Sequence, residues 1–280
     1  MMKACVIGWP VEHSLSPALH GTWLRQYGIA GEYVKRAVRP ADLPATLGSL
    51  AAEGWRGCNL TVPHKEAALP LLDRVAAGAR RIGAVNTVAV ENGKLAGFNT
   101  DGFGFLENLR AAVPGFDAKA GPAVVLGAGG AARAIVDALA GAGAPEIRIV
   151  NRARARATRL GDELAPGVAR IQPWAERTAA LAGAALLVNA TSLGMEKNPP
   201  LEIDLARLPK TAVVDDIVYA PLETALLKAA KARGNPTVDG LGMLLHQGRP
   251  GFRLWFGVMP EVTPALREAV LAAMGSCEHP

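Results

Sequence analysis

Two ionisable residues in the N-terminal half, Lys65 and Asp101, have the side-chain types and the positions expected of a pair that transfers a proton. Lys65 lies in "NLTVPHKEA" (59–67), just after an apolar run, where a helix is expected to begin. The first turn of a helix favours carboxylates, because its unpaired N–H groups and its dipole make that end positive. An ammonium there should lose its proton more easily than in water, which suits a general acid or base.

Asp101, in "FNTDGFG" (98–104), is the natural partner for such a lysine. A Lys–Asp pair could hold a reacting oxygen between its two side chains and exchange a proton with it. Each residue also has an ordinary structural interpretation: Lys65 as a surface lysine of a first helical turn, and Asp101 as the N-cap of a helix from Gly102. The residues by themselves leave both interpretations open.

Two hydroxyls precede the first expected helix. Ser14 and Ser16 lie in "EHSLSP" (12–17), two residues apart, and on an extended backbone both would face the same side. Two hydroxyls beside a helix N-terminus can bind a carboxylate. The alternative is that either serine simply caps the helix.

A glycine loop in the second half predicts dinucleotide binding. "GAGGAA" (127–132) fits G-x-G-x-x-G/A directly after a buried strand and opens a helix. The first glycine permits a tight turn, the second lets the backbone approach a pyrophosphate, and the small Ala132 lets helix and strand pack closely. The phosphates would meet the N–H groups of the helix N-terminus. A glycine-rich turn that merely connects strand and helix is the alternative.

The end of the next expected strand indicates which dinucleotide is bound. NAD sites usually present Asp or Glu about 20 residues beyond the glycines, for the ribose 2′-hydroxyl. This chain has Asn151 and Arg152 there, followed by Arg154, Arg156 and Arg159. Guanidinium groups grip a 2′-phosphate that a carboxylate would repel, so NADP is predicted. If a helix starts near Ala153, Arg156 and Arg159 share a face at its N-terminal end. A solvated basic helix face is the alternative.

The first hundred residues alternate strand-like and helix-like segments, as a mainly parallel sheet requires. The apolar pattern predicts strands over 3–8, 31–38 and 57–62, helices over 17–27 and 41–53, the second capped by Asp42, and a hairpin over 84–101 turning at Asn92-Gly93. A second unit begins near residue 101. It is expected to contain a strand–turn–helix–strand segment over 123–152, two further apolar strands over 184–190 and 211–219, and helices in the last forty residues.

The fold class predicted is therefore α/β, with two units and a cleft between them. An N-terminal α/β substrate and catalytic domain over 1–100, completed by C-terminal helices over 241–280, would have a mainly parallel sheet. A Rossmann-like domain over 101–240 would bind NADP.

Composition excludes several classes of protein. Of 280 residues, 50% are hydrophobic and 20% charged, which is typical of a globular chain, and no apolar run reaches the roughly 18 residues of a membrane span. Cys5, Cys58 and Cys277 lack motif spacing, which favours a reducing, cytoplasmic compartment over disulfides or a metal site. The net charge of +5 is dispersed, so we expect a small-molecule ligand and no nucleic acid.

The motifs together resemble those of the shikimate dehydrogenase family. They are "SLSP" (14–17), "NLTVPHK" (59–65), "GAVNT" (83–87), "NTDG" (99–102), "GAGGAAR" (127–133), "NR" (151–152) with Arg156, "NATSLGM" (189–195), "DIVY" (216–219) and "GLGMLLHQG" (240–248). The resemblance spans nearly the whole chain in family order. It implies NADPH-dependent reduction of 3-dehydroshikimate to shikimate, a step towards chorismate and the aromatic amino acids.

The resemblance also implies roles for individual residues. Lys65 and Asp101 become the catalytic pair, and the substrate would be bound by Ser14, Ser16, Thr61, Lys65, Asn86, Asp101, Tyr219 and Gln247. The cofactor would be held by Gly127, Ala128, Gly129, Gly130 and Ala131 at the pyrophosphate, by Asn151, Arg152 and Arg156 at the adenosine end, and by Thr191, Ile217, Gly240 and Met243 at the nicotinamide. Asn189, Asp215 and His64 are expected to be hydrogen-bonded scaffold, and no metal site is expected.

One departure from the family pattern concerns the cofactor. Relatives often have Thr where this chain has Ala153, so the grip on the 2′-phosphate would depend more on the arginines. Two rival functions remain: a quinate or dual quinate/shikimate dehydrogenase, whose relatives often use NAD, and a catalytically silent dinucleotide-binding regulator. The intact Lys65 and Asp101 favour an enzyme. A monomer and a homodimer are equally compatible with the sequence.

Overall fold

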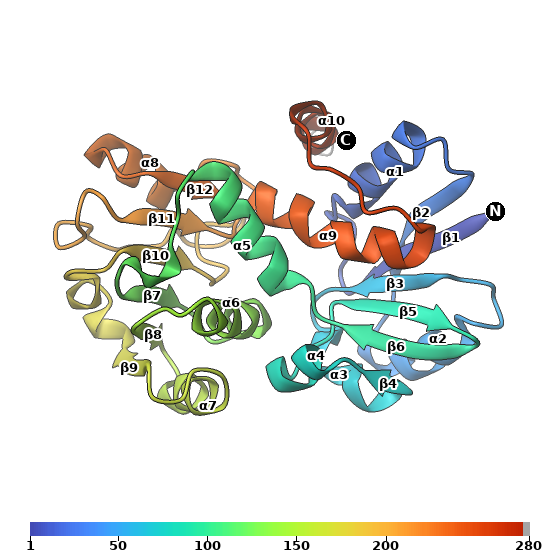
Figure 1. The fold of residues 1–280 in the computed structure, drawn as a ribbon, viewed down its shortest axis with the longest axis horizontal. Coiled ribbons are helices and arrows are strands. Elements are labelled where there is room, and N and C mark those ends of the chain that lie inside the picture. The colour runs from blue at the N-terminus through green and yellow to red at the C-terminus, as the bar shows by residue number, and fades with distance from the viewer. Residues whose placement is uncertain (277–280) are drawn as a thin grey trace. The chain divides into compact units, whose positions relative to one another are not determined.

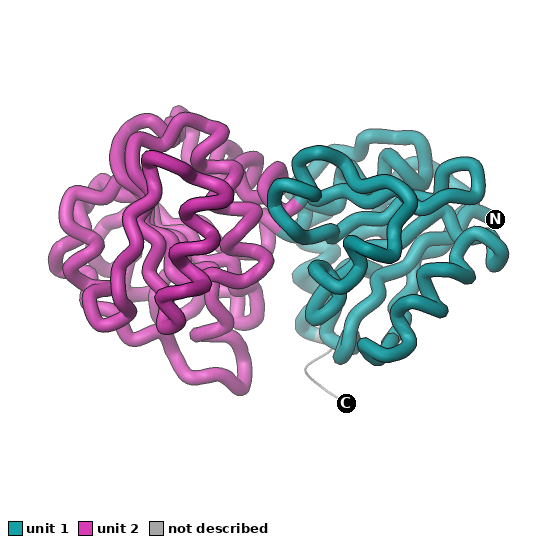
Figure 2. Tube along the Cα trace, turned by 90° about the horizontal axis from the view of Figure 1, so that it is seen from below, with its two compact units in different colours: residues 1–100, 244–280 teal, residues 101–243 magenta. Residues whose placement is uncertain are grey.

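A computed structural model describes residues 1–276 of the chain. Contacts divide the chain into two compact units, one formed by residues 1–100 with the segment from Leu244 onward, the other by residues 101–243 (Figure 2). The last four positions of the segment 241–280, which include Cys277, lie outside the described residues. Each unit is built on a six-stranded sheet (Figure 1).

The sheet of the first unit has the order β2-β1-β3-β5-β6-β4. Its strands are β1 (Met2–Gly8), β2 (Gly31–Ala37), β3 (Gly57–Leu60), β4 (Arg74–Val75), β5 (Thr87–Glu91) and β6 (Lys94–Phe98). Strand β1 is parallel to β2 and β3, and β4 is parallel to β6, whereas β5 is antiparallel to β3 and β6. Asn92 and Gly93 both have positive φ, as the predicted hairpin turn requires.

The helices of the first unit include segments from both ends of the chain. They are α1 (Ser16–Gln26), α2 (Leu43–Ser49), α3 (His64–Ala67), α4 (Ala77–Ile82), α9 (Gly240–Phe256), which starts in the second unit, and α10 (Pro264–Ser276), with short 3-10 turns at Pro40–Asp42 and Leu69–Leu71. The helix predicted over 41–53 is shorter than expected. Asp42 precedes α2, but its side chain makes no capping bond, because its backbone is already helical, with φ −91° and ψ −8°.

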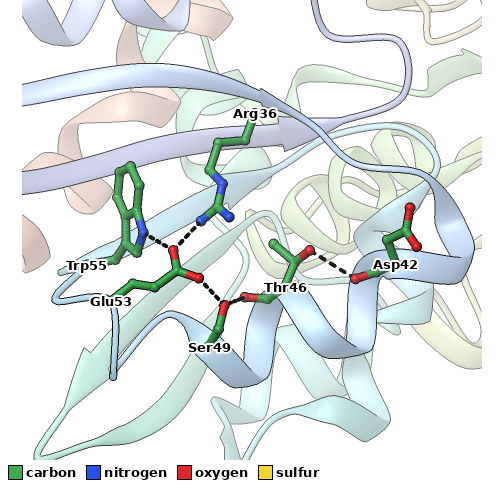
Figure 3. A network of polar contacts seen from close by, with 6 residues as sticks. All are labelled: Arg36, Asp42, Thr46, Ser49, Glu53 and Trp55. Atoms are coloured by element: carbon green, nitrogen blue, oxygen red, sulfur yellow. Dashed lines mark hydrogen bonds and ion pairs between the residues drawn. The ribbon is translucent and has the colours of Figure 1, made fainter.

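A polar network holds the end of α2 against strand β2 (Figure 3). Glu53 is its centre: its carboxylate accepts hydrogen bonds from the Ser49 hydroxyl and the Trp55 indole and forms an ion pair with Arg36 at 3.2 Å. The bonds from Ser49 and Trp55, with a smaller effect of Arg36, hold the pKa of Glu53 below its usual value of 4.5. Because the folded pKa is depressed, the ionised carboxylate stabilises the fold above pH 4.5, and this contribution is lost as the pH falls through the folded pKa.

Replacing Glu53 by glutamine should therefore destabilise the protein at neutral pH. The network is solvent-exposed, so we expect a loss of about 0.5–1 kcal/mol at pH 7 that shrinks as the pH falls below 4.5. Urea unfolding of the wild type and E53Q at both pH values measures this difference. Glu66→Gln, at an exposed carboxylate for which residues 1–276 provide no ion-pair partner, is the matched control. A loss that stays constant with pH would contradict the electrostatic explanation.

The sheet of the second unit is entirely parallel, in the order β12-β11-β10-β7-β8-β9. Its strands are β7 (Ala123–Leu126), β8 (Ile147–Asn151), β9 (Ala169–Pro173), β10 (Leu186–Asn189), β11 (Val213–Asp216) and β12 (Thr237–Asp239). Numbered from β7, the strands run 6-5-4-1-2-3 across the sheet, which is the doubly wound order of dinucleotide-binding domains. The α/β class and the Rossmann-like second unit are thus confirmed.

Helices cover both faces of this sheet, and each cover completes an apolar core. Helices α5 (Asp101–Ala112), α6 (Gly130–Gly141) and α7 (Arg154–Leu164) pack on one face, through residues such as Phe105, Ile135 and Leu160. Helix α8 (Ala225–Arg233) and the segment 201–208 pack on the other, and short 3-10 turns lie at Ala118–Ala120, Trp174–Glu176 and Ala179–Leu181. Strands covered on both faces explain the uninterrupted apolar runs of the sequence. In the described part of the chain, no helix has the length and apolar character needed to cross a bilayer.

Candidate functional site

Thr61, one of the predicted substrate residues of the first unit, lies just beyond the carboxyl ends of two parallel strands. Thr61 directly follows β3, and its N–H donates to the carbonyl of Ile7 at the end of β1 at 2.9 Å. A Cβ on Gly8 would lie 2.4 Å from the Thr61 methyl, so the glycine allows the close approach of the two strand ends. In α/β sheets this edge is where ligands bind.

The two serines lie near each other, but not as predicted. Leu15 between them has φ −86° and ψ −2°, so the backbone is not extended and the same-side argument was wrong. Leu15 is the N-cap of α1 and already takes helical angles. The Ser14 hydroxyl instead accepts the Ser16 N–H at 3.3 Å, and Ser16 is 5% exposed.

Lys65 lies in α3, which has only four residues. A single turn has no extended macrodipole, so the electrostatic misfit that the sequence suggested has little physical basis. The half-buried Lys65 is fixed through its main chain instead, because its carbonyl accepts the Val85 N–H at 2.8 Å and so joins α3 to the segment before β5.

Asn86 and Gln247, separated by 161 positions in sequence, are brought together by the fold. The Asn86 Nδ2 donates to Gln247 Oε1 at 3.3 Å and to the Thr100 hydroxyl at 2.9 Å, while Thr100 donates its N–H to Asn86 Oδ1 at 2.9 Å. Asn86 is 2% exposed and Gln247 8%. Asp101, 4% exposed, follows Thr100 as the first residue of α5 and belongs to the second unit, as does Tyr219, whose pKa burial raises. The pairing of Lys65 with Asp101 stays a prediction.

The glycine loop has the geometry that a pyrophosphate needs. Gly127 has φ +111°, and a Cβ there would lie 2.9 Å from the Ala190 carbonyl oxygen, so both the turn and the close packing require glycine. A Cβ on Gly129 or Gly130 would meet no atom within 4 Å, so the loop faces open space. Helix α6 begins there without a side-chain cap or an acidic residue in its first turn, and its N–H groups can meet an anion.

The arginines beyond β8 are exposed and unopposed. Arg152, Arg156 and Arg159 are exposed, and within residues 1–276 none of them forms an ion pair. Ala153 is the N-cap of α7, so the helix begins at Arg154, close to the start that was expected near Ala153. Asn151 closes the turn by donating its Nδ2 to the Ala153 carbonyl at 2.9 Å. A cluster of exposed guanidinium groups beside a glycine loop suits a phosphate on the adenosine ribose.

The residues predicted at the nicotinamide end also gather at the carboxyl edge of this sheet. A Cβ on Gly240 would lie 2.2 Å from the Ile217 carbonyl oxygen, and Ile217 and Met243 belong to the same apolar cluster. The Thr191 hydroxyl is used locally, since it donates to Asn189 Oδ1 at 2.7 Å. Asn189 also donates to Asp216 and is the hydrogen-bonded scaffold residue that was expected.

Asp215 is not the hydrogen-bonded residue that the sequence analysis expected. It is 1% exposed, lies between Val188 and Val238 on the neighbouring strands, and its Oδ2 has no hydrogen-bond partner among the described residues. Burial, with smaller effects of the carboxylates of Asp216 and Asp239, raises its pKa well above 3.8. His64 is the expected hydrogen-bonded residue at one of its two ring nitrogens. Its Nε2 lies 2.8 Å from the Val38 carbonyl oxygen, while its Nδ1 has no hydrogen-bond partner in the described part of the chain.

Replacing Asp215 by asparagine should stabilise the protein above pH 4. The folded state keeps the proton that the unfolded chain releases above 3.8, so wild-type stability falls as the pH rises. The advantage of D215N should grow by about 1.4 kcal/mol per pH unit until Asp215 ionises in the folded state. Urea unfolding between pH 4 and pH 8 measures it. Asp162→Asn, at an exposed aspartate of α7, is the control and should show no comparable advantage at any pH. A pH-independent difference for D215N would contradict the prediction.

Sequence reasoning missed a set of buried polar residues in the first unit. Tyr33, Asn59 and Thr87 are at most 6% exposed and are hydrogen-bonded to one another or to Asn86. Asn59 carried a signal, since an amide in the apolar run "GCNLTV" must find a partner. For the described residues, no group of three or more His, Cys, Asp and Glu side chains is arranged to hold a metal.

The doubly wound sheet, the uncapped glycine loop and the arginines beyond β8 define a dinucleotide-binding α/β protein with a second α/β unit. Three family models match the chain: the shikimate dehydrogenase substrate binding domain over residues 6–88, shikimate / quinate 5-dehydrogenase over 111–198, and the shikimate 5′-dehydrogenase C-terminal domain over 240–271. The chain belongs to the shikimate dehydrogenase family.

Individual relatives agree with these matches. The chain is 58% identical over 272 residues to the shikimate dehydrogenase (NADP(+)) of Rhodospirillum rubrum, covering 96% of each chain. Its structure is similar to that of shikimate 5-dehydrogenase from Thermus thermophilus in complex with NADP(H) and shikimate, with a TM-score of 0.87, 43% identity and coverage of 98% and 100%. It is also similar to quinate dehydrogenase from Corynebacterium glutamicum in complex with NAD, with a TM-score of 0.89, 34% identity and coverage of 97% and 99%.

Proposed function

We propose that this protein catalyses the reversible, NADP-dependent interconversion of 3-dehydroshikimate and shikimate, in the pathway to chorismate and the aromatic amino acids. The observation that carries the proposal is the identity of 58% with an NADP-dependent shikimate dehydrogenase over nearly the full length of both chains. The exposed arginines after β8 support NADP over NAD, because nothing acidic follows that strand before Asp162.

The residues of the second unit fit NADP. The N–H groups at the start of α6 would hold the pyrophosphate in front of Gly129 and Gly130, where a Cβ would find no neighbour. Asn151, Arg152 and Arg156 would hold the adenosine end. Thr191, Ile217, Gly240 and Met243 would line the nicotinamide side, and Ala128 and Ala131 complete the glycine loop. The bound cofactor supplies or accepts the hydride.

Most of the proposed substrate residues belong to the first unit. The second unit contributes two, Asp101 and Tyr219. Ser14 and Ser16 would bind the substrate carboxylate, and Thr61, Asn86, Gln247 and Tyr219 the ring hydroxyls. We assign Lys65 and Asp101 to the reacting oxygen: one side chain gives the proton to the oxygen formed on reduction, and takes it back in oxidation. The domain assignment follows, with residues 1–100 and 241–280 for substrate and 101–240 for NADP.

The test is the absorbance of the reduced nicotinamide with four combinations of substrate and cofactor. Shikimate and quinate, each with NADP and with NAD, should give the highest kcat/KM for shikimate with NADP. Better turnover of quinate with NAD would favour the quinate alternative. The similarity to an NAD-bound quinate dehydrogenase is the observation that supports this alternative. NADPH binding without any turnover of dehydroshikimate would instead support a silent regulator.

The setting of the enzyme is part of the same proposal. We place it in the cytoplasm, as a monomer or homodimer that acts on small molecules and not on nucleic acid or membranes. Cys5 and Cys58 are free thiols, in keeping with a reducing compartment. Light scattering coupled to gel filtration would distinguish monomer from dimer, and a larger assembly would contradict the assignment.

A further inference from the structure

A chain of buried hydrogen bonds in the first unit runs from strand β2 to helix α9. The Tyr33 hydroxyl donates to Asn59 Oδ1 at 2.6 Å, and Asn59 Nδ2 donates to the Thr87 hydroxyl at 3.1 Å. Thr87 then donates to Asn86 Oδ1 at 3.0 Å, and Asn86 Nδ2 to Gln247 Oε1 at 3.3 Å. All five side chains are at most 8% exposed, so an unmade bond in the chain would be costly.

Backbone groups fix the direction of every bond in this chain. Asn59 Nδ2 also donates to the Asn86 carbonyl at 3.0 Å, which can only accept, so Asn59 must turn its oxygen toward Tyr33. The Thr100 N–H, which can only donate, points at Asn86 Oδ1 at 2.9 Å, so Asn86 must turn its NH2 group toward Gln247. The orientation of both amides is therefore determined.

The same logic determines how Gln247 meets a ligand. Its Oε1 accepts from Asn86, and its Nε2 donates one hydrogen to the Leu244 carbonyl at 3.0 Å. Within residues 1–276, the second Nε2 hydrogen has no acceptor. Gln247 therefore offers a donor to the substrate, and a ring oxygen that accepts a hydrogen bond is the group it would recognise.

Tyr33 is itself held rigidly at the start of the chain. Its ring lies 4.1 Å from the His20 ring at an angle of 13°, within a cluster that includes Trp255. Burial lowers the pKa of His20 to about 3, so this imidazole is neutral, and burial raises the pKa of Tyr33 well above 10. The phenol therefore keeps its proton at physiological pH and remains a donor to Asn59.

We propose that Tyr33 is a positioning residue for the substrate: through Asn59 and Thr87 it orients the amide of Asn86, and through Asn86 that of Gln247. This inference rests on the proposed function, because it takes Asn86 and Gln247 as substrate-binding residues. The Tyr33 hydroxyl is hydrogen-bonded to Asn59 and not to Asn86 or Gln247, so it acts on these two amides through Asn59. Tyr33 should strengthen the binding of the substrate and of the transition state equally. The reason is that the chain of hydrogen bonds orients substrate-binding groups and does not include the proton-transfer pair.

The test compares Tyr33→Phe with Tyr27→Phe. Tyr27 lies in the same aromatic cluster and accepts the Glu261 N–H at 3.2 Å, but does not join the chain. Y33F should raise the KM for shikimate about 5–10-fold, change kcat less than about threefold and leave the KM for NADP unchanged. Y27F should change none of these. Equal effects of the two variants, or a loss of kcat alone, would overturn the proposal.

A second variant and a ligand-free measurement make the test independent of catalysis. Thr87→Val breaks the chain one link further on, so it should raise the shikimate KM similarly, and Y33F/T87V should be clearly less than multiplicative. In NMR spectra of the ligand-free protein, Y33F should move the side-chain amide signals of Asn59, Asn86 and Gln247. Unmoved signals overturn the positioning role whatever the wild type catalyses, whereas a wild type inactive on shikimate would refute only the proposed function.

Discussion

Lys65→Ala is expected to lower kcat by about 10²–10⁴-fold while the KM for shikimate changes little. The expected loss has this size because a positioned acid or base acts only in the transition state, where the proton moves to or from the reacting oxygen. The fold fixes the Lys65 main chain through the bond from Val85, so removing the side chain should leave the surrounding structure in place.

Steady-state rates with shikimate and NADP measure this effect, and circular dichroism checks that the variant is folded. Glu66→Ala is the matched control, because Glu66 is the next residue of the same helical turn and is exposed. Its kcat should stay within a factor of about two of the wild type. A large rise in KM for K65A at unchanged kcat would reassign Lys65 to binding. Partial recovery of rate by a small primary amine would support the proton-transfer role.

Arg152→Asp should raise the KM for NADP by about 10²-fold and change the KM for NAD less than about threefold. The variant loses charge-assisted bonds to the 2′-phosphate and places a carboxylate where that phosphate would lie. The neighbouring Ala153 offers no hydroxyl to compensate. NAD has only a hydroxyl at this position, and an aspartate can accept a hydrogen bond from it.

The measurement is the kcat/KM ratio for the two cofactors at saturating shikimate, with direct binding of NADPH and NADH as a second readout. Arg170→Asp, at an exposed arginine of β9, carries the same change of charge and is the control. Equal losses for NADP and NAD in R152D would mean that the arginine does not meet the 2′-phosphate. Equal effects of R152D and R170D would mean that the change in net charge, and not a contact of Arg152 with the 2′-phosphate, weakens NADP binding.

Local motifs of the cofactor unit could be predicted because their chemistry is contiguous in sequence. Gly127, Ala132 and Arg152 lie within 26 positions of one another, and each is required by the backbone or the charge of its own strand–turn–helix segment. The Asn92-Gly93 turn was predictable for the same reason, since positive φ at two successive positions is a local requirement.

Predictions that needed a particular backbone angle were less successful. The same-side geometry of Ser14 and Ser16 failed because Leu15 takes helical angles as the N-cap of α1. The dipole argument for Lys65 failed because α3 ends after one turn. Sequence patterns locate a helix more reliably than they determine its first residue or its length, because capping depends on the packing of the segment as a whole.

From the sequence alone follow the α/β class, the cofactor loop with its basic partner and the family to which the chain belongs. Only the tertiary structure decided that Tyr33, Asn59, Asn86 and Gln247 form one directed chain of hydrogen bonds. It also decided that Asp215 is buried, with no hydrogen-bond partner for its Oδ2 among residues 1–276. The physical reason is the range of the interactions. A turn or a phosphate loop is determined by neighbouring residues, whereas a bond across 161 positions and the burial of a carboxylate depend on which strands and helices pack together.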